Sequence, residues 1–554
     1  FANGLNGGFV YDDNLVLSNT HFTQPWSALK FLSKPYFDDV PQAGLYRPFT
    51  QISFAFNFLF STRPFGFHLL NIILHALNIF LLYRLLLKLT LAPRLAMLTV
   101  LLFLVLPIHV EAVTSIVGRA ELLVFGLGMV AIWLWLNKRY WLAGSTLLLA
   151  LLSKETAVSV PIILALLAWA YRRGWRWLWP QAAAIGIYLA LRLAVLGEYA
   201  FGVKAEFIFN PLVGAPVWQR ILTAAKVLLL YLQKIFIPYN LSADYSYDQI
   251  PVVTSPANMA AWLGIGVLTG MGWFAYRSVK YGQLNIPALA VIFFLPPYLV
   301  ISNLIVPIGT IMGDRLMYFP SLGMAVLLGG GLLWLVKHQR IIGGLAVAAI
   351  LVVFSFLTVR QNQVWANEET LMRAAYERSP DSVVVKANLG VIVVNSDTEL
   401  ARRLAQEVYA QYPDHIKNLN LLAALAVKDR DFPAAQRWLE RALTLRPRHQ
   451  GTLENLSRVY FTRNKLSEAE AILYTLATRY GGTGNVIFYA VAKVQNGKPQ
   501  EAIAILDNYF GASTDESVRT VKDYASAKLG LHSLAKELDN KYKQLALSFR
   551  YAQK

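Results

Sequence analysis

The sequence predicts an all-α membrane protein, in which a polytopic bundle of membrane helices is followed by a solenoid of helical repeats. Two observations lead to this prediction. Long apolar stretches crowd into the chain before about residue 360, and the mean hydropathy of the 554 residues is +0.43. After that point, small residues recur at intervals of 33 or 34. Apolar runs of about 20 residues cross a bilayer as helices, and a fixed period of roughly 20 to 50 residues is typical of stacked repeats.

We expect about ten membrane spans. Eight are apolar runs of roughly the length that crosses a bilayer, and two shorter runs form a pair interrupted at Lys154 and Glu155. The eight runs are 64–88, 95–116, 120–137, 178–196, 258–276, 285–302, 319–336 and 341–359, and the shorter pair is 141–153 and 157–171. A further apolar segment, 218–237, carries Arg220, Lys226, Gln233 and Lys234. We expect it to lie along the membrane interface or to re-enter the membrane.

The orientation follows from the positive-inside rule, because cytoplasmic loops carry an excess of Lys and Arg. One set of short loops is basic and is placed in the cytoplasm: its cations are Lys88, Arg94, Lys138, Arg139, Arg172, Arg173, Arg176, Arg277, Lys280, Lys337 and Arg340. Residues 1–63, 197–255 and 360–554 then lie outside the cytoplasm. If 218–237 spanned the membrane, the last two basic loops would move outside, so the charge bias favours the interfacial placement.

Composition narrows the class of protein further. The formal net charge is +18, but many Lys and Arg residues lie in short loops between apolar helices and no nucleic-acid-binding motif is present. The expected partner is therefore membrane lipid and not nucleic acid. The absence of Cys excludes disulfide and thiol chemistry. We expect the bacterial inner membrane, with the repeats in the periplasm or outside the cell, or the endoplasmic reticulum if the chain is eukaryotic.

The start of the chain does not have the features of a signal peptide. Residues 1–14 contain no basic segment and no apolar core. Because residue 1 is placed outside the cytoplasm, we expect one further N-terminal span ahead of it. The domains predicted for this chain are a first extracytoplasmic loop with an acidic motif over 1–63, a transmembrane domain over 64–359 and a repeat domain over 360–554.

The last third of the chain has the period of tetratricopeptide repeats. Ala401, Ala435, Ala469 and Ala502 are spaced by 34, 34 and 33 residues, and Pro380, Pro413 and Pro447 by 33 and 34. Small residues are needed where the two helices of a repeat cross closely, and Pro or Gly ends a helix. We expect four repeats, 381–414, 415–448, 449–481 and 482–515, and a terminal helical cap. Stacked repeats form a groove that can bind a peptide or protein, although oligomerisation and structural bracing are alternatives.

Charged residues gather in the loops predicted to face outward. Charges at membrane depth are costly and are candidates for functional sites. Transfer of a sugar from a lipid phosphate needs a carboxylate that takes the proton of the acceptor hydroxyl, and cations that hold the departing phosphate. Asp12 or Asp13 could be the base, and the candidates for binding the donor are Arg47, Glu111, Arg119, Lys154 and Arg315. Residues that could line the same site are His68, Asn71, His109, Glu121, Asp244 and Asp314.

Simpler interpretations of these polar residues stay open. Asp314 could pair with Arg315, and Arg119 with Glu121, without any ligand. His68, Asn71, His75 and Asn78 are spaced by 3, 4 and 3 residues and therefore share one helix face. Such a face is typical of hydrogen bonding between helices, and only its outer members, His68 and Asn71, would be near the site.

Five segments together resemble the transmembrane and tetratricopeptide-repeat O-mannosyltransferases, or their bacterial relatives, of the GT-C glycosyltransferase superfamily. The segments are Val10–Asn14, Tyr46–Pro48, Pro64–Asn71, Leu106–Ala112 and Gly313–Ser321, and Asn240–Tyr247 and the repeats add to the likeness. The resemblance implies an inverting, metal-independent transferase without a cofactor. Its donor would be a polyprenyl-phosphate-linked mannose or other hexose, and its acceptor a Ser or Thr hydroxyl of a secreted or membrane protein.

The same resemblance assigns roles within the acidic motif. The catalytic acidic residue of such enzymes lies in the first outer loop and corresponds here to Asp12 and Asp13, with Asp12 favoured as the base by analogy. Asp314 is a departure, because Glu is the more frequent residue there. The expected but absent first span is another departure, and without it the groove for the donor would be incomplete.

Three other functions fit parts of the sequence. A GT-C transferase acting on a lipid or cell-surface glycan would not need the repeats. A non-enzymatic membrane-anchored scaffold for secretion or pilus assembly would not need the outer charges. A transporter would place ionisable residues near the middle of the membrane. Alanine at Asp12 and Asp13 would abolish glycosylation under either enzyme hypothesis and leave scaffolding unchanged.

Overall fold

The structure is a computed structural model that describes residues 1–14, 25–37, 43–89, 91–201, 205–511 and 515–530. Within these residues, every regular element is an α-helix or a short 3₁₀ helix. The prediction of an all-α fold is confirmed. The chain divides into two compact units, Phe1–Val385 and Lys386–Lys554.

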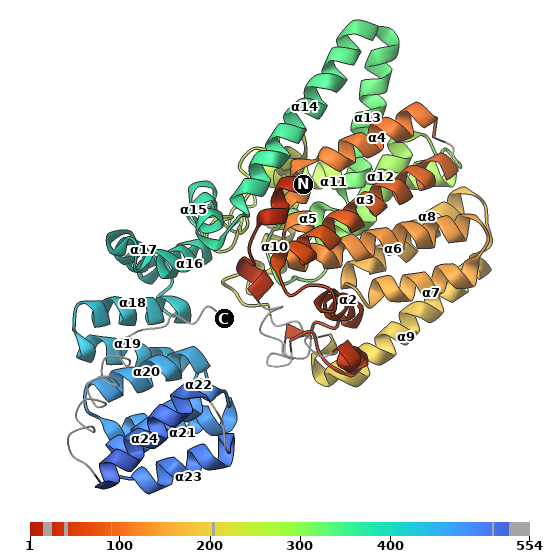
Figure 1. Ribbon diagram of the computed structural model, residues 1–554. Coiled ribbons are helices and arrows are strands. Elements are labelled where there is room, and N and C mark those ends of the chain that lie inside the picture. The colour runs from red at the N-terminus through yellow and green to blue at the C-terminus, as the bar shows by residue number, and fades with distance from the viewer. Residues whose placement is uncertain (15–24, 38–42, 90, 202–204, 512–514, 531–554) are drawn as a thin grey trace. The chain divides into compact units, whose positions relative to one another are not determined.

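The first unit is a bundle of apolar helices (Figure 1). Among the described residues, six helical segments are long and apolar enough to cross a membrane. They are α3 (Pro64–Lys88), Ile116–Leu136 with α6 (Arg119–Leu136), Trp175–Ala200 with α9 (Trp179–Leu196), α11 (Met259–Lys280), α13 (Ser321–His338) and α14 (Arg340–Val364). These segments confirm that the chain is an integral membrane protein.

Breaks in the chain explain why fewer full-length spans are found than the ten predicted. Helix α4 (Pro93–Val105) and the following segment Pro107–Thr114 would make a seventh span, but they meet at an angle of 54°. Pro107 has no backbone N–H and cannot continue the hydrogen bonding of α4. Three predicted runs form apolar helices of only 10–17 residues. These are α7 (Tyr140–Leu151), Glu155–Ala170 with α8 (Ser159–Ala170), and α12 (Ile286–Ile301).

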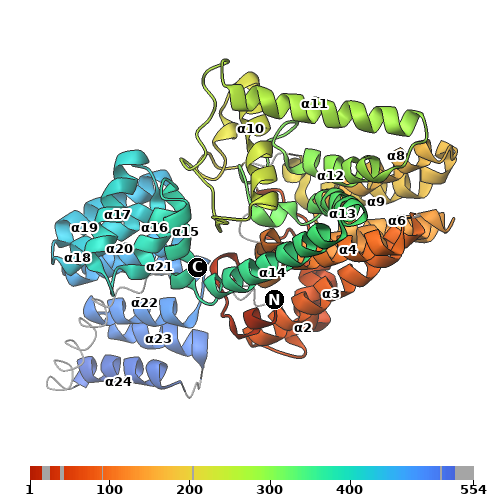
Figure 2. The same ribbon diagram turned by 90° about the horizontal axis from the view of Figure 1, so that it is seen from above.

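Helix α10 (Val217–Phe236) is the charged segment expected at the membrane interface. It packs against α11 (Figure 2) and buries one face that includes Leu228 and Tyr231. It is not among the helices apolar enough to span, and its placement at the interface stays a prediction. Further α-helices among the described residues of this unit are α2 (Pro48–Phe58), α5 (Val110–Thr114) and α15 (Glu368–Arg378).

Helices α6, α7 and α9 pack as neighbours: α6 lies against α7, and α7 against α9. The crossing of α7 and α9 is close, because a Cβ atom at Gly144 would lie 2.6 Å from the carbonyl oxygen of Pro180. Only glycine fits such an approach without displacing the backbone. Three charged residues predicted for the site lie at these helix ends: Arg119 and Glu121 at the N-terminal end of α6, and Lys154 just after α7.

The second unit consists of antiparallel helices in succession (Figure 1). Helix α18 packs on α19, α20 on α21, and α22 on α23. Each of the repeats predicted over 415–448, 449–481 and 482–515 thus contains two packed helices, and Ala435, Ala469 and Ala502 are fully buried. The bounds are α16 (Val383–Val393), α17 (Thr398–Gln411), α18 (Ile416–Lys428), α19 (Phe432–Leu445), α20 (Gln450–Thr462), α21 (Leu466–Arg479), α22 (Thr483–Gln495), α23 (Pro499–Phe510) and α24 (Glu516–Gly530).

The division between the units falls after Val385, later than residue 360, where the sequence places the start of the repeat domain. Helix α15 and the residues after it are bound to the first unit. Arg378 donates a hydrogen bond of 2.6 Å to the carbonyl oxygen of Leu241, and Ser382 donates one of 2.9 Å to Asp244.

Candidate active site

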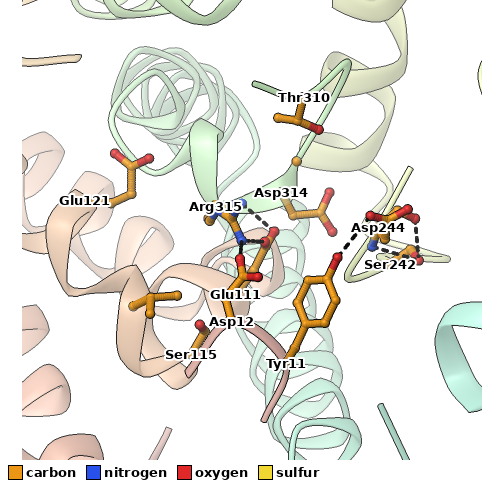
Figure 3. Close-up of polar contacts among 12 residues, drawn as sticks. Tyr11, Asp12, Glu111, Ser115, Glu121, Ser242, Asp244, Thr310, Asp314 and Arg315 are labelled. Atoms are coloured by element: carbon orange, nitrogen blue, oxygen red, sulfur yellow. Dashed lines mark hydrogen bonds and ion pairs between the residues drawn. The ribbon is translucent and has the colours of Figure 1, made fainter. Parts of the chain in front are cut away.

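Three loops that are distant in sequence meet at Arg315 (Figure 3). Its Nη1 donates a 2.8 Å hydrogen bond to Oε1 of Glu111 and lies 3.4 Å from Oδ2 of Asp12. The backbone N–H of Arg315 donates to the other oxygen of Glu111, also at 2.8 Å. Asp12 lies in the 3₁₀ helix Tyr11–Asp13, Glu111 in α5, and Arg315 in the 3₁₀ helix Asp314–Met317. We call these three residues the Asp12–Arg315–Glu111 cluster.

The three members differ in their access to solvent. The side chain of Glu111 is 4% exposed, that of Arg315 is 27% exposed and that of Asp12 is 34% exposed. Glu111 is therefore the buried anchor that fixes the guanidinium. The Nε and Nη2 atoms of Arg315 have no hydrogen-bond partner among the residues that the structure describes. A guanidinium with free donors beside an accessible carboxylate can bind an oxyanion while the carboxylate takes a proton.

Asp13 is placed differently from its neighbour. It is fully buried, and its carboxyl accepts hydrogen bonds from the Val117 backbone N–H at 3.0 Å, the Ser115 hydroxyl at 3.2 Å and the Val10 backbone N–H at 3.4 Å. Burial raises the pKa of Asp13 to about 7, against the opposing effect of these hydrogen bonds. Asp13 thus fixes the first loop on the loop that follows α5, and Asp12 faces the open side.

The raised pKa of Asp13 makes stability depend on pH. Its folded pKa is about 7 and its ordinary value is 3.8, so the folded state binds this proton more tightly than the unfolded state. The contribution of Asp13 to the free energy of unfolding is therefore largest below about pH 4. It falls as the pH rises to about 7, by an amount on the order of 4 kcal/mol. Asp13→Asn should flatten that decline, measured as melting temperature against pH in detergent. Equal slopes for both proteins would contradict this role.

The loop between α10 and α11 holds the other acidic candidates away from Arg315. Asp244 accepts a hydrogen bond of 3.3 Å from the hydroxyl of Tyr11, and it also accepts from Ser246 and Ser382. The hydroxyl of Tyr245 donates to Asp314 at 3.0 Å. Burial raises the pKa of Asp314 to about 7. Asp244 and Asp314 therefore connect the loops around the cluster, and the alternative pairing of Asp314 with Arg315 is wrong.

A second charged group lies at the ends of α7 and α9. Arg47 donates hydrogen bonds of 2.8 and 3.0 Å to Glu155, which also lies 3.5 Å from Arg192. Lys154 is paired with Glu121. Burial lowers the pKa of Lys154; Glu121 opposes this effect, and the positive charges of Arg47 and Arg315 add to it. Three of the four cations predicted to hold a phosphate, Arg47, Lys154 and Arg315, are therefore within electrostatic reach of one another, and each has a carboxylate partner.

Comparisons with known proteins show which proteins this chain is similar to. The chain is 25% identical over 519 residues to "Protein O-mannosyl-transferase TMTC3" of Mus musculus, an alignment that covers 85% of this chain and 52% of the relative. It is 26% identical over 491 residues to "Protein O-mannosyl-transferase TMTC1" of Homo sapiens, covering 76% and 55%. This chain is similar to the TMTC protein O-mannosyl-transferases. No protein-family model and no solved structure matches the chain.

Another relative is similar over a shorter segment. With "Protein O-mannosyl-transferase Tmtc2" of Drosophila melanogaster it is 30% over 331 residues, which is 54% of this chain and 35% of that relative. The chain spans about half the length of the TMTC1 and TMTC3 relatives that it matches. The resemblance predicted from the motifs is confirmed.

Arg119 is not part of the charged groups. The predicted donor-binding role does not fit its position, because it is fully buried at the start of α6. Its guanidinium donates to the side-chain oxygens of Asn71 and Asn57, both at 2.8 Å, and to the carbonyl oxygens of Ser53 and Phe67. It does not pair with Glu121, as the alternative had it. Arg119 holds α2, α3 and α6 together.

Substitution of Arg119 should therefore affect stability and not donor binding. Arg119→Lys keeps the charge but loses the planar fork of donors, and it should cost about 2–4 kcal/mol of unfolding free energy. Melting temperature in detergent measures this loss. The matched variant Arg47→Lys, in the group at the end of α7, should stay closer to wild type in stability. A rise in KM for the donor with Arg119→Lys at unchanged stability would show that Arg119 binds the donor after all.

The polar face of α3 serves helix packing. Asn71 donates to the carbonyl oxygen of Ser115 at 3.0 Å, and Asn78 to that of Leu122 at 3.0 Å. His75 lies 2.7 Å from the hydroxyl of Tyr318. The structure thus supports the alternative of hydrogen bonding between helices, which removes Asn71 from the site lining.

Two predicted histidines are also buried. His68 lies 3.4 Å from the carbonyl oxygen of Gly8, so it supports the first loop and does not face the cluster. His109 lies 2.7 Å from the hydroxyl of Ser321. Within the described residues, no group of three or more His, Asp or Glu side chains is arranged to hold a metal ion.

Sequence reasoning missed several residues of this region. Tyr11 and Tyr245 bind the acidic residues of neighbouring loops, and Glu155 and Arg192 complete the group around Arg47. Glu155 was visible as a charge between two short apolar runs. Tyrosines give no comparable signal in a chain with 27 of them.

Proposed function

We propose that this chain transfers mannose or another hexose from a polyprenyl phosphate to Ser or Thr hydroxyls of secreted or membrane proteins. The Asp12–Arg315–Glu111 cluster is the reaction centre of this proposal. The observation that carries it is the contact between an accessible carboxylate and an accessible guanidinium where three loops meet. The names of the TMTC relatives, protein O-mannosyl-transferases, support the type of transfer and the protein acceptor.

The reaction follows from the positions of the two groups. The acceptor hydroxyl oxygen forms a bond to C1 of the sugar, and the bond from C1 to the phosphate oxygen breaks. The electron pair leaves with the polyprenyl phosphate, and the hydroxyl proton passes to Asp12. Arg315, held by Glu111, stabilises the charge that develops on the phosphate. The contact between Arg315 and Asp12 is long and half-exposed, so its replacement by a phosphate oxygen costs little.

Arg47 and Lys154 provide further positive charge for the donor phosphate in this proposal. Each is already paired with a carboxylate, so the phosphate would share the cation with Glu155 or Glu121. The proposal needs no cofactor besides the lipid-linked donor. It places the cluster and the repeats outside the cytoplasm, in the inner membrane of a bacterium or the endoplasmic reticulum of a eukaryote. The basic loops on the other side support that orientation.

The repeat unit is proposed to bind the acceptor protein. Between α21 and α22 lies a cavity of about 310 Å³, lined in part by Tyr474 and Tyr489, whose rings are 5.7 Å apart. Glu470 and Lys498 add opposite charges to its wall. Aromatic rings next to paired charges can hold an extended peptide by apolar contact and hydrogen bonds.

Tyr474→Ala should raise KM for a protein acceptor about tenfold and leave kcat within about twofold, because Tyr474 is exposed and has no part in the proposed chemistry. Steady-state transfer to an acceptor protein measures both constants. Tyr509→Ala, an exposed tyrosine of α23 outside this cavity, is the control. Equal KM values for all three proteins would exclude the cavity as the acceptor site.

Transfer itself is tested with the purified full-length chain in detergent. It is incubated with polyprenyl-phosphate hexoses and with extracytoplasmic proteins of its host, and intact-mass spectrometry detects the added mass of one hexose. We expect a gain with at least one donor, unchanged by EDTA and sensitive to alkaline β-elimination. If the mass of a hexose were added only to lipid or glycan acceptors, the proposed protein acceptor would be wrong and the alternative GT-C function would be supported.

A further inference from the structure

We propose that this chain binds an anionic phospholipid headgroup in a cavity formed by Lys138–Leu142 and Arg176–Pro180. The cavity has a volume of about 670 Å³, which lies within the range of small-molecule sites. We call it the basic cavity. It is separate from the Asp12–Arg315–Glu111 cluster and has no part in the proposed transfer.

The basic cavity lies at the opposite ends of the helices that support the charged groups. Helix α6 begins at Arg119 and ends at Leu136, just before the cavity. Helix α7 starts within the cavity and leads to Lys154, and α9 starts there and leads to Arg192, which contacts Glu155. An α-helix of 18 residues is about 27 Å long, close to the thickness of the hydrocarbon core of a bilayer. The cavity and the cluster therefore belong to opposite faces of the membrane.

The cations of the basic cavity have no carboxylate to neutralise them. Lys138, Arg139 and Arg176 line it, and its described lining contains no Asp or Glu. Residues 122–154 and 156–197 contain no acidic residue at all. In contrast, Arg47, Lys154 and Arg315 at the other face are each paired with a glutamate. A concave site with three unneutralised cations is suited to an anion.

Two neighbouring arginines, Arg172 and Arg173, differ from the cavity cations because their guanidinium groups already bind carbonyl oxygens at helix ends. Arg173 donates to the carbonyl oxygen of Trp135 at the end of α6, and Arg172 donates to that of Lys280 at the end of α11. They satisfy helix ends and do not line the cavity. Arg176, by comparison, lies over the ring of Trp177 at 4.6 Å, with its charge open to a ligand.

Aromatic rings beside the cations favour a lipid over a soluble phosphate. Trp141 and Trp179 line the cavity and are 74% and 70% exposed. Tyr140 and Trp177 stack at 4.5 Å and form a flat apolar wall. Tryptophan is enriched at membrane interfaces, where its ring contacts both headgroups and acyl chains. A charged head joined to apolar chains matches this combination of cations and exposed rings, as in basic pockets that bind anionic lipid headgroups.

The test is a titration of the delipidated full-length chain, in a neutral detergent, with short-chain phosphatidylglycerol, followed by native mass spectrometry. Phosphatidylcholine of the same chain length and inorganic phosphate are the other two probes. The variant is Arg139→Gln with Arg176→Gln, both at exposed positions. Lys337→Gln with Arg340→Gln, at the end of α13 and the start of α14, is the control with the same change in charge. If the Arg139→Gln, Arg176→Gln protein does not fold, Lys138→Gln alone is tested in its place.

We expect phosphatidylglycerol to bind the wild-type and control proteins, and the variant to bind it about tenfold or more weakly. Phosphatidylcholine should bind weakly to all three proteins, and inorganic phosphate should not displace the lipid. Equal affinity of the variant and the wild type would overturn the proposal. So would displacement by inorganic phosphate, which would indicate a site for a soluble anion, or equal binding of phosphatidylcholine, which would indicate an apolar site.

Discussion

Replacing Asp12 by Asn should lower kcat for hexose transfer by about 10²- to 10⁴-fold. The amide has the size of the carboxyl but cannot take the proton of the acceptor hydroxyl. The side chain is 34% exposed and lies 3.4 Å from Arg315, so stability should change by less than about 1 kcal/mol. Steady-state transfer, with the melting temperature measured in parallel, separates loss of chemistry from loss of fold.

Asp13→Asn is the matched control, because it makes the same change in charge one residue along the same 3₁₀ turn. Asp13 is buried and hydrogen-bonded to Val117 and Ser115, so its substitution should change stability and leave most of kcat. If Asp13→Asn abolished transfer and Asp12→Asn did not, the two roles assigned here would be reversed.

Replacing Arg315 by Met should reduce both activity and stability. The carboxylate of Glu111, 4% exposed, would lose its charged partner inside the protein, which costs about 3–5 kcal/mol. Loss of the cation that faces the leaving phosphate should lower kcat by about 10²- to 10³-fold. Transfer rates corrected for the folded fraction, together with denaturation curves, measure the two effects.

A double variant separates the effect of Arg315 on activity from its effect on stability. Arg315→Met with Glu111→Gln removes both charges, so stability should return toward that of the wild type, because neither charge is left unpaired. Activity should stay low. If the double variant transferred hexose at the wild-type rate, Arg315 would have only a structural role and the cluster would not be the reaction centre.

Much of the fold could be predicted because it depends on local patterns. Apolar length predicts the helices of the bundle, and the 34-residue period predicts the paired helices from α18 to α23. The number of full-length spans was harder to predict. Pro107 bends one span, and the charged residues Lys154 and Glu155 separate two short helices. Neither the angle of such a break nor its position in the membrane follows from composition.

The site was predictable in its residue types but not in its contacts. Asp12, Glu111 and Arg315 are charges beside apolar runs, and this made them candidates. Their contacts join residues 204 positions apart for Glu111 and Arg315, which no local pattern reveals. Arg119 has the same sequence signal as Arg315, yet it faces the core. In the 3₁₀ turn, adjacent residues point about 120° apart, so the sequence alone could not decide which aspartate faces Arg315.

The donor phosphate is expected to bind at Arg315. A structure of the full-length chain with a polyprenyl-phosphate hexose analogue that cannot transfer its sugar would test this expectation most directly. We predict phosphate oxygens within hydrogen-bond distance of Arg315 and the anomeric carbon on the side of Asp12, with Glu111 still bound to the guanidinium. A phosphate held away from Arg315, at Arg47 and Lys154 alone or in the basic cavity of Lys138, Arg139 and Arg176, would contradict the account.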